Sequence, residues 1–263
     1  MMAMAYTTQL QAGLGMLDET RELLLLWKPG DSIGTLYNRA LSSGRFPSLS
    51  ARRLRNIIAE CFAPRFLSGT YNSAELLRPI MKVLAANEFR QLCLIYTARA
   101  NQIIADFIRE VFWQSYAAGR TSITNDQARD FVTEANRNGR TGAPWSEITM
   151  RRVASYLTGT LADFGFLEHG NRGVRTLSIV RLEERVAGLL AHDLHFCGST
   201  DSQIVAAQEW SLFGLEQHDV IDTLRRISFH GWFVFQAAAA SVRLGWKYRT
   251  VEELADAICD GKL

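Results

Sequence analysis

The chain has 263 residues, of which 48% are apolar and 21% are charged. That composition can build a substantial core and argues against intrinsic disorder. The net charge of +2 does not by itself indicate a nucleic-acid partner, but lysine supplies only four of the 29 cationic residues and arginine the other 25. Arginine grips phosphate and guanine edges through a planar fork of donors, although a GC-rich genome would produce the same bias.

Membrane-spanning, secreted and disulfide-linked proteins are the classes that the sequence argues against. Residues 1–11 do not show a basic start followed by an apolar stretch, so we expect no signal peptide. The longest apolar runs, at 23–27 and 231–244, fall short of the ~20 residues that a membrane helix needs. The cysteines have no paired spacing and are expected to be reduced thiols in a cytoplasmic protein. They are Cys61, Cys93, Cys197 and Cys259.

The first 118 residues are expected to form a helical N-terminal domain, because apolar residues recur there at three- and four-residue spacing. Pro29 and Gly30 end the first helix, which Thr7 or Thr8 can cap. Pro64 is expected to end the third helix. The expected helices cover about 7–27, 31–41, 50–62, 73–86, 88–100 and 101–117.

Residues 119–182 are expected to form a winged-helix-like central module. Thr124 and Ser146 are suited to cap two helices, and Gly165 marks the end of the second. Two helices followed by a hairpin with a glycine at its tip is the order of a winged helix. The expected elements are helices at about 126–136 and 147–164, an extended piece at 166–168, a turn at 171–173 and a strand at 174–180.

Residues 183–263 nearly repeat this order as a C-terminal helical and hairpin module. The second expected strand is open to another interpretation, because 237–240 is a run of alanines that would also suit a helix. The sequence therefore predicts a mainly α protein: a helical N-terminal domain with a helix-turn-helix, then winged-helix-like modules with short β-hairpins. The C-terminal expectations are helices at 182–196, 201–208, 216–228 and 251–260, and strands at about 230–237 and 240–247.

Charge is unevenly distributed along the chain. Six arginines and one acid, Glu60, lie between Arg39 and Arg65. Between His192 and Asp222 there are six acids and neither lysine nor arginine. This pattern indicates one basic face, which would meet phosphate, and one acidic end, which would meet a basic protein.

Two arginine groups are placed as a DNA-binding protein would need them. One opens the helix that follows a short helix and a glycine-containing turn, which is helix-turn-helix order. The other combines the start of the 147–164 helix with the hairpin, whose tip can lie against the backbone or the minor groove. Each group alone could be an ordinary solvated surface, whereas both together favour DNA contact. The predicted DNA-binding residues are Arg52, Arg53, Arg55, Arg151, Arg152, Arg172 and Arg175.

Motifs for catalysis are missing from the sequence. There is no phosphate-binding glycine loop ending in Gly-Lys-Ser/Thr, and no Gly-x-Ser-x-Gly elbow. His192, His195 and Cys197, with His218 further on, could in principle hold zinc, but their spacing fits no common zinc pattern. We therefore expect no enzyme, no metal, no cofactor and no small-molecule substrate.

Several stretches of the sequence together match a known family in their order. They begin at Tyr6, Leu17, Phe62, Tyr96, Asp106, Trp145 and Leu161. They resemble the BrxA family, components of bacteriophage-exclusion (BREX) systems that were formerly described as inner-membrane proteins. The resemblance covers roughly 6–183 and is looser after about 185. It implies a helical protein with winged-helix-like modules that binds double-stranded DNA and acts in phage restriction with a DNA methyltransferase, a large ATPase and an alkaline-phosphatase-like protein.

Two other functions remain open on the sequence alone. The acidic 193–222 stretch and exposed aromatic residues would suit a protein–protein adaptor within the defence complex. A six-helix N-terminal bundle would also suit an RNA-binding protein of the antitermination-factor type. A heparin column separates an adaptor from a DNA-binding protein, and competition between duplex DNA and structured RNA separates the two nucleic-acid hypotheses.

Overall fold

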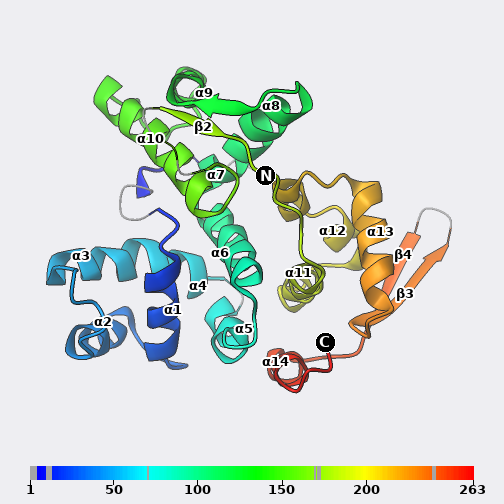
Figure 1. The fold of residues 1–263 in the computed structure, drawn as a ribbon. Coiled ribbons are helices and arrows are strands. Elements are labelled where there is room, and N and C mark those ends of the chain that lie inside the picture. The colour runs from blue at the N-terminus through cyan, green and yellow to red at the C-terminus, as the bar shows by residue number, and fades with distance from the viewer. Residues whose placement is uncertain (1–4, 10–13, 70, 169, 171–172, 239–240) are drawn as a thin grey trace.

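A computed structural model describes residues 5–9, 14–69, 71–168, 170, 173–238 and 241–263. The protein is mainly helical, with two small antiparallel two-stranded sheets (Figure 1). None of the helices in these ranges is both long and apolar enough to cross a bilayer.

The N-terminal helices pack around a short, mostly aliphatic core. Ser32 caps α2 and Ser50 caps α3, each accepting a hydrogen bond from a backbone N–H three residues on. Leu24 and Trp27 are fully buried beside them. The elements are α1 (Leu17–Leu26), α2 (Ile33–Ser42), α3 (Ala51–Asn56), the π-helical turn η2 (Ile57–Phe62), α4 (Ala63–Phe66), α5 (Ser73–Ile80) and α6 (Ala86–Ala100).

Among the described residues the first α-helix begins at Leu17, ten residues later than the sequence predicts, and residues 10–13 of the expected helix lie outside the described residues. The prediction of one continuous helix from Thr7 or Thr8 is wrong, because 14–16 are not helical. The Gly15 amide donates to Asp163 Oδ2 at 3.0 Å, and a Cβ on Gly15 would lie 2.5 Å from Asp163 Cβ. Met16 follows in the left-handed region with φ 51°, which is incompatible with a continuous helix. A tertiary contact therefore overrides the helical pattern of this segment.

The third helix does not end at Pro64, as the sequence predicts. It continues from α3 through η2 into α4, and the Ala63 amide bonds to the Ile58 carbonyl, five residues back. This shift of the hydrogen bonds leaves Pro64 in the first turn of α4, where a missing N–H is tolerated.

The central part of the chain contains a long interrupted helix, two further helices and a small sheet. β1 pairs antiparallel with β2, with Ile123 opposite Arg175, and an antiparallel bridge joins Leu167 to Leu177. The sequence predicted the returning strand but not β1. The elements are α7 (Gln102–Phe107), the π-helical turn η3 (Ile108–Phe112), α8 (Trp113–Ala117), β1 (Ser122–Thr124), α9 (Asn125–Arg137), α10 (Glu147–Asp163) and β2 (Val174–Thr176).

The C-terminal part places three helices before a hairpin. The Trp232 ring occupies the space over Gly188, where a Cβ would lie 2.4 Å from a ring carbon, so only glycine allows this approach. The alanine-rich region belongs to the hairpin strands, although 239–240 lie outside the described residues. The elements are α11 (Glu184–Phe196), α12 (Asp201–Val205), the 3-10 turn η4 (Gln208–Phe213), α13 (Gln217–Ser228), β3 (Phe233–Ala238), β4 (Ser241–Trp246) and α14 (Val251–Cys259).

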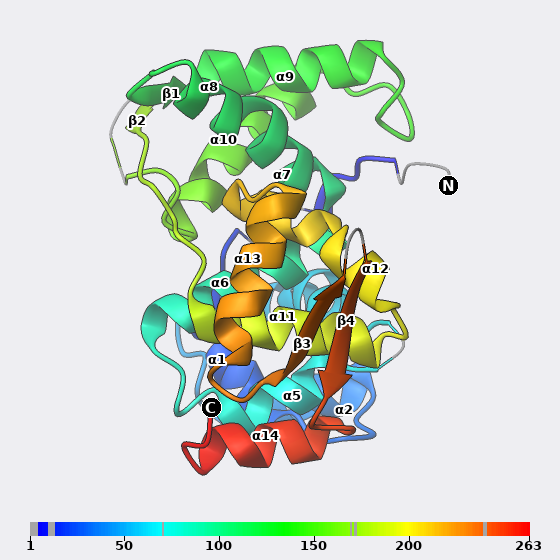
Figure 2. The same cartoon turned by 90° about the vertical axis from the view of Figure 1, so that its right-hand side faces the viewer.

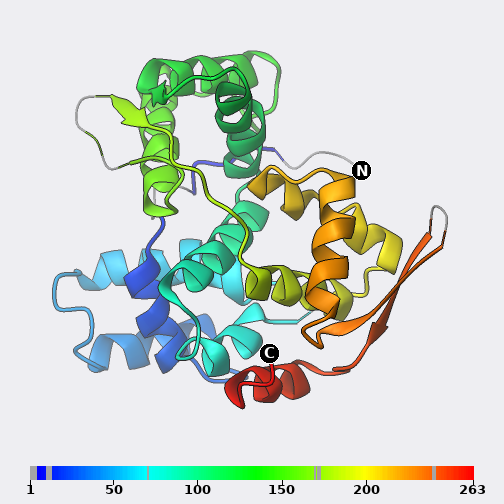
Figure 3. The ribbon, with the colours of Figure 1, turned by 45° about the vertical axis from the view of Figure 1, so that its right-hand side comes forward.

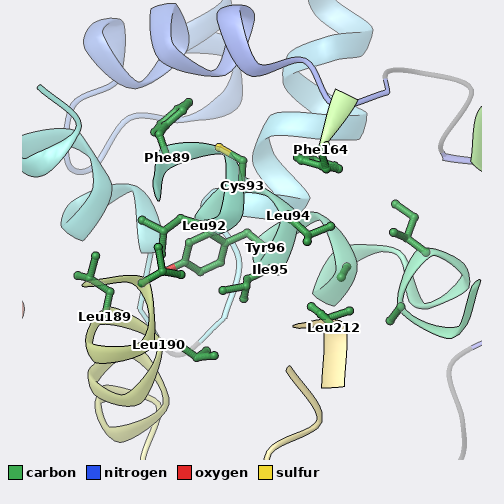
Figure 4. Packing of buried hydrophobic residues seen from close by; sticks show 14 of the residues in the cluster. Phe89, Leu92, Cys93, Leu94, Ile95, Tyr96, Phe164, Leu189, Leu190 and Leu212 are labelled. Carbon is green, nitrogen blue, oxygen red and sulfur yellow. The ribbon is translucent and has the colours of Figure 1, made fainter. Parts of the chain in front are cut away.

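Helix α6 lies between the N-terminal helices and α11 (Figures 1 and 2). Eight successive residues, 91–98, are buried, so the helix is enclosed on every side rather than amphipathic. Figure 4 shows Leu92 and Tyr96 of α6 near Leu189 of α11, with Leu212 of η4 beyond its far end. The helix therefore connects the basic N-terminal region to the rest of the molecule.

Candidate nucleic-acid interface

Helix α10 has one buried face and one open face. Its N-cap Ser146 accepts a hydrogen bond from the Thr149 amide at 3.3 Å, which sets the start of the helix. Val153, Leu157 and Leu161 are fully buried against the rest of the protein. The open face spans the first three turns and carries Ile148, Arg151, Arg152 and Ser155.

The two predicted arginines on α10 are exposed and free to bind an external anion. Neither Arg151 nor Arg152 forms an ion pair, a hydrogen bond or a ring contact with a described residue. The acid nearest to them in the helix, Glu147, is already paired with Arg129 of α9. Because no described carboxylate is paired with them, both guanidinium groups are available to bind an external phosphate.

The other two arginines predicted for this unit, Arg172 and Arg175, follow α10 in the chain. Arg175 lies on β2 and is half-buried, and Arg172 lies outside the described residues. The Asn125 amide donates to the Gly173 carbonyl at 2.7 Å, which fixes the β2 end of this hairpin against the start of α9. The Thr158 hydroxyl donates to Asn125 Oδ1 at 2.8 Å, so α10, α9 and the hairpin are held to one another.

The N-terminal arginine group lies on α3. Arg52 and Arg55 are exposed and Arg53 is half-buried. The Arg55 guanidinium lies 4.9 Å from the centre of the Tyr37 ring of α2, a cation–π contact that holds it in place. In Figures 1 and 3, α2 and α3 occupy the same side of the molecule as α10 and β2, and the C-terminal part lies on the other side. The helices that carry the two described arginine groups therefore lie on the same side of the molecule.

The acids expected to form an acidic end over 193–222 differ in exposure and in their partners. Asp193 is buried: it accepts from the Tyr96 hydroxyl at 2.9 Å, from the Tyr71 hydroxyl and from Arg99. Glu209 accepts from Arg99 Nε at 2.7 Å.

The remaining acids divide between an internal contact and one helix start. Asp201 Oδ2 accepts from the Leu244 amide at 3.0 Å, which ties α12 to β4. Glu216, Asp219 and Asp222 lie at the start of α13 and are exposed to different degrees. A charge count along the sequence cannot distinguish acids that hold the fold together from acids that face solvent.

The Asp193 network lies at a junction between segments far apart in the sequence. A cleft of about 500 Å³ is lined there by residues of α4, α6, α11 and η4. Burial and the Asp193 carboxylate raise the pKa of the Tyr71 and Tyr96 phenols, so both remain protonated donors. The hydrogen bonds and the ion pair of Asp193 therefore join the N-terminal helices to α11.

The histidine and cysteine group does not form a metal site among the described residues. His192 is buried in an aromatic cluster, its Nδ1 lies 2.9 Å from the Gly188 carbonyl, and burial lowers its pKa to about 4. His195 stacks on Trp246 with a centroid distance of 4.2 Å. Within the ranges that the structure covers, no three side chains of His, Cys, Asp or Glu are placed to share an ion.

The comparisons with known proteins agree with this fold. The sequence model of the BrxA family matches residues 4–193. An uncharacterized protein from Magnetospirillum magneticum has a similar crystal structure, with a TM-score of 0.58 and 15% identity over 73% of this chain and 96% of that one. No protein of the curated set matches the sequence. At 15% identity the solved structure supports the fold alone, but the family match covers most of the chain, which therefore belongs to the BrxA family.

Proposed function

We propose that this protein is a non-enzymatic, double-stranded DNA-binding subunit of a BREX-type phage-defence system. The observation that carries the proposal is the open face of α10, where Arg151 and Arg152 are exposed and have no partner among the described residues. Family membership supports the defence context and association with other BREX components. A methyltransferase, an ATPase and a phosphatase-like protein are the proposed partners, and the cytoplasm is the proposed location.

The order and pairing of the central elements support a winged helix. A helical segment over 102–117 precedes β1, α9 and α10, and the chain then returns through β2 to pair with β1. In this arrangement α10 corresponds to the recognition helix, whose first turns face base edges in the major groove. The hairpin beside it corresponds to the wing and would place Arg175, with Arg172, against the neighbouring backbone.

The proposed second contact is α3, which follows α2 in helix-turn-helix order. Arg52 and Arg53 would neutralise phosphates, and Arg55, stacked on Tyr37, would do so from a fixed position. Because α3 is short and continues into η2, we assign it to backbone contact and assign base contact to α10.

The adaptor hypothesis loses support because three of the six acids in its proposed surface are bound by groups within the protein. Asp193 and Glu209 bind Arg99, and Asp201 binds a backbone amide. The hypothesis that remains in competition is RNA binding, which the same arginines would serve. Competition of labelled duplex DNA with unlabelled structured RNA decides between the two nucleic acids.

The testing experiment is fluorescence anisotropy of a short labelled duplex across a salt series from about 50 to 200 mM. We expect log affinity to fall linearly with log salt, with a slope near −0.9 for each neutralised phosphate. In the Arg151→Glu/Arg152→Glu variant the slope should become shallower by about two units. The matched control is Arg78→Glu/Arg249→Glu, which changes net charge equally at exposed positions on α5 and after β4. Equal loss in both variants, or no binding at low salt, would refute the proposal.

A further inference from the structure

We infer that Ile148 of α10 contacts the 5-methyl group of a thymine in the major groove, which gives the protein a preference for an A·T pair at that position. The inference rests on the proposed function and adds to it a base-reading residue. The site predicted from the sequence contained only arginines and gave no role to Ile148, the apolar residue on the same helix face.

Ile148 shares a helix face with the two free arginines. Residues three, four and seven positions apart lie on one side of an α-helix, so Arg151, Arg152 and Ser155 line up with Ile148. The buried side of the helix is formed by Met150, Val153 and Leu157 instead. Ile148 therefore points away from the core, and 63% of its surface is exposed.

Exposure alone does not distinguish Ile148, because other large apolar residues are also exposed and single ones are common on protein surfaces. Its position does. It is the second residue of the helix, so it lies in the N-terminal turn that reaches base edges in a recognition helix. One turn later, two unpaired guanidinium groups are available to bind phosphate or guanine on either side of it.

The chemistry of the major groove gives such a group a specific partner. Thymine is the only base of unmodified DNA that presents a methyl group there, and apolar side chains recognise it by contact. A branched aliphatic side chain cannot form hydrogen bonds with the other base edges, so its burial against them leaves their donors and acceptors unsatisfied. An exposed isoleucine one turn before two free arginines therefore fits a thymine next to phosphate or guanine contacts.

The corresponding helix of the C-terminal part has no such combination. The second residue of α13 is His218, whose imidazole lies 3.3 Å from Asp219 and 3.7 Å from Glu216. The position that matches Arg152 is Asp222, which is paired with Arg225. The apolar group flanked by free cations is therefore a property of α10 and not of this element order in general.

Deoxyuridine tests the inference because it lacks only the methyl group of thymine. Affinities are measured for two labelled duplexes of alternating dA and dT or of alternating dA and dU, at one salt concentration. We expect the wild-type protein to bind the thymine duplex about threefold to fourfold more tightly, the factor for burial of one methyl group. In Ile148→Ala that ratio should fall to one, and alanine preserves the helix.

Ile179→Ala is the matched control, because Ile179 is similarly exposed, at 54%, and lies outside α10. This variant should keep the wild-type preference for thymine. Equal affinity of the wild-type protein for both duplexes, or an unchanged ratio in Ile148→Ala, overturns the inference and leaves duplex binding itself intact. Failure of the wild-type protein to bind either duplex at low salt refutes the proposed function and the inference with it.

Discussion

The central unit (β1, α9, α10 and β2) and the C-terminal unit (α11, α12, α13, β3 and β4) both combine helices with one two-stranded antiparallel sheet. In the central unit β2 follows α10 and pairs back with β1, and in the C-terminal unit the β3–β4 hairpin follows α13. Their exposed helix faces differ. Arg151 and Arg152 of α10 have no described partner, whereas Arg225 and Arg226 of α13 are paired with Asp222 and Glu184. Both units therefore expose a helix with arginines. Whether that helix can attract a polyanion depends on whether nearby acids neutralise its arginines.

The largest expected effect is a loss of stability when Asp193 is replaced, with duplex binding by α10 unchanged. Asp193→Ala leaves Arg99 without one of its carboxylates and removes the acceptor of two tyrosine hydroxyls. Breaking a buried pair of this kind costs about 3–5 kcal/mol of unfolding free energy. Urea denaturation measures this loss, and duplex affinity below the transition should stay within about twofold. A stable variant with lost affinity would show that the junction takes part in DNA binding.

Acid should destabilise the C-terminal unit before the central one. Burial lowers the pKa of His192 to about 4, below its ordinary 6.5, so the folded state favours the neutral ring. Above pH 6.5 His192 is neutral in both the folded and the unfolded chain, so it does not affect stability. Between pH 6.5 and 4 only the unfolded chain takes up the proton, and the free energy of unfolding falls by roughly 3 kcal/mol. Thermal unfolding of the wild type and of His192→Phe across this range should show a weaker pH dependence in the variant. Identical profiles would exclude His192 as the cause.

Two glycines allow the units to be disturbed separately. A Cβ at Gly188 would lie 2.4 Å from the Trp232 ring, and one at Gly15 would lie 2.5 Å from Asp163 Cβ at the end of α10. Each alanine substitution should cost about 1–3 kcal/mol through overpacking. Only Gly15→Ala should also weaken duplex binding, because it displaces α10. The comparison fails if Gly188→Ala weakens binding as much, measured by anisotropy at equal folded fraction.

The smallest expected effect is an increase in duplex affinity. Asp222→Arg removes the carboxylate partner of Arg225 and gives α13 two cations that no acid of this helix neutralises, although Arg225 still lies over the Phe235 ring. Duplex affinity should rise roughly threefold to tenfold at low salt, with a steeper salt slope. Asp222→Asn serves as the control for loss of the acid alone and should show a smaller rise. No change in either variant would mean that α13 does not face the duplex in the complex.

The sequence was sufficient where local signals and burial agreed. Ser146 and Thr124 predicted the starts of α10 and α9 to within a residue or two, because side-chain caps act over three residues. The arginines at the start of α10 were identified for the same reason, since a helix start and its exposed face can both be read from spacing.

The remaining features depend on contacts between distant segments. The late start of α1 depends on Gly15 meeting Asp163, and the passage through Pro64 depends on a π-helical turn. β1 has three residues, too few to show alternation. The burial of Asp193 depends on donors about a hundred residues away in the chain, so no count of acids could reveal it.

The enclosure of α6 has a consequence for how the protein tolerates substitution. In amphipathic helices such as α9 and α13, buried positions recur every three or four residues, and the positions between them are free to vary. Along 91–98 every residue is buried, including Gln91, whose amide groups bond to the Arg181 carbonyl and the Glu183 amide. In a mutational scan scored by solubility, polar substitutions should therefore be harmful at all eight positions of 91–98. In an amphipathic helix they would be harmful only at every third or fourth position.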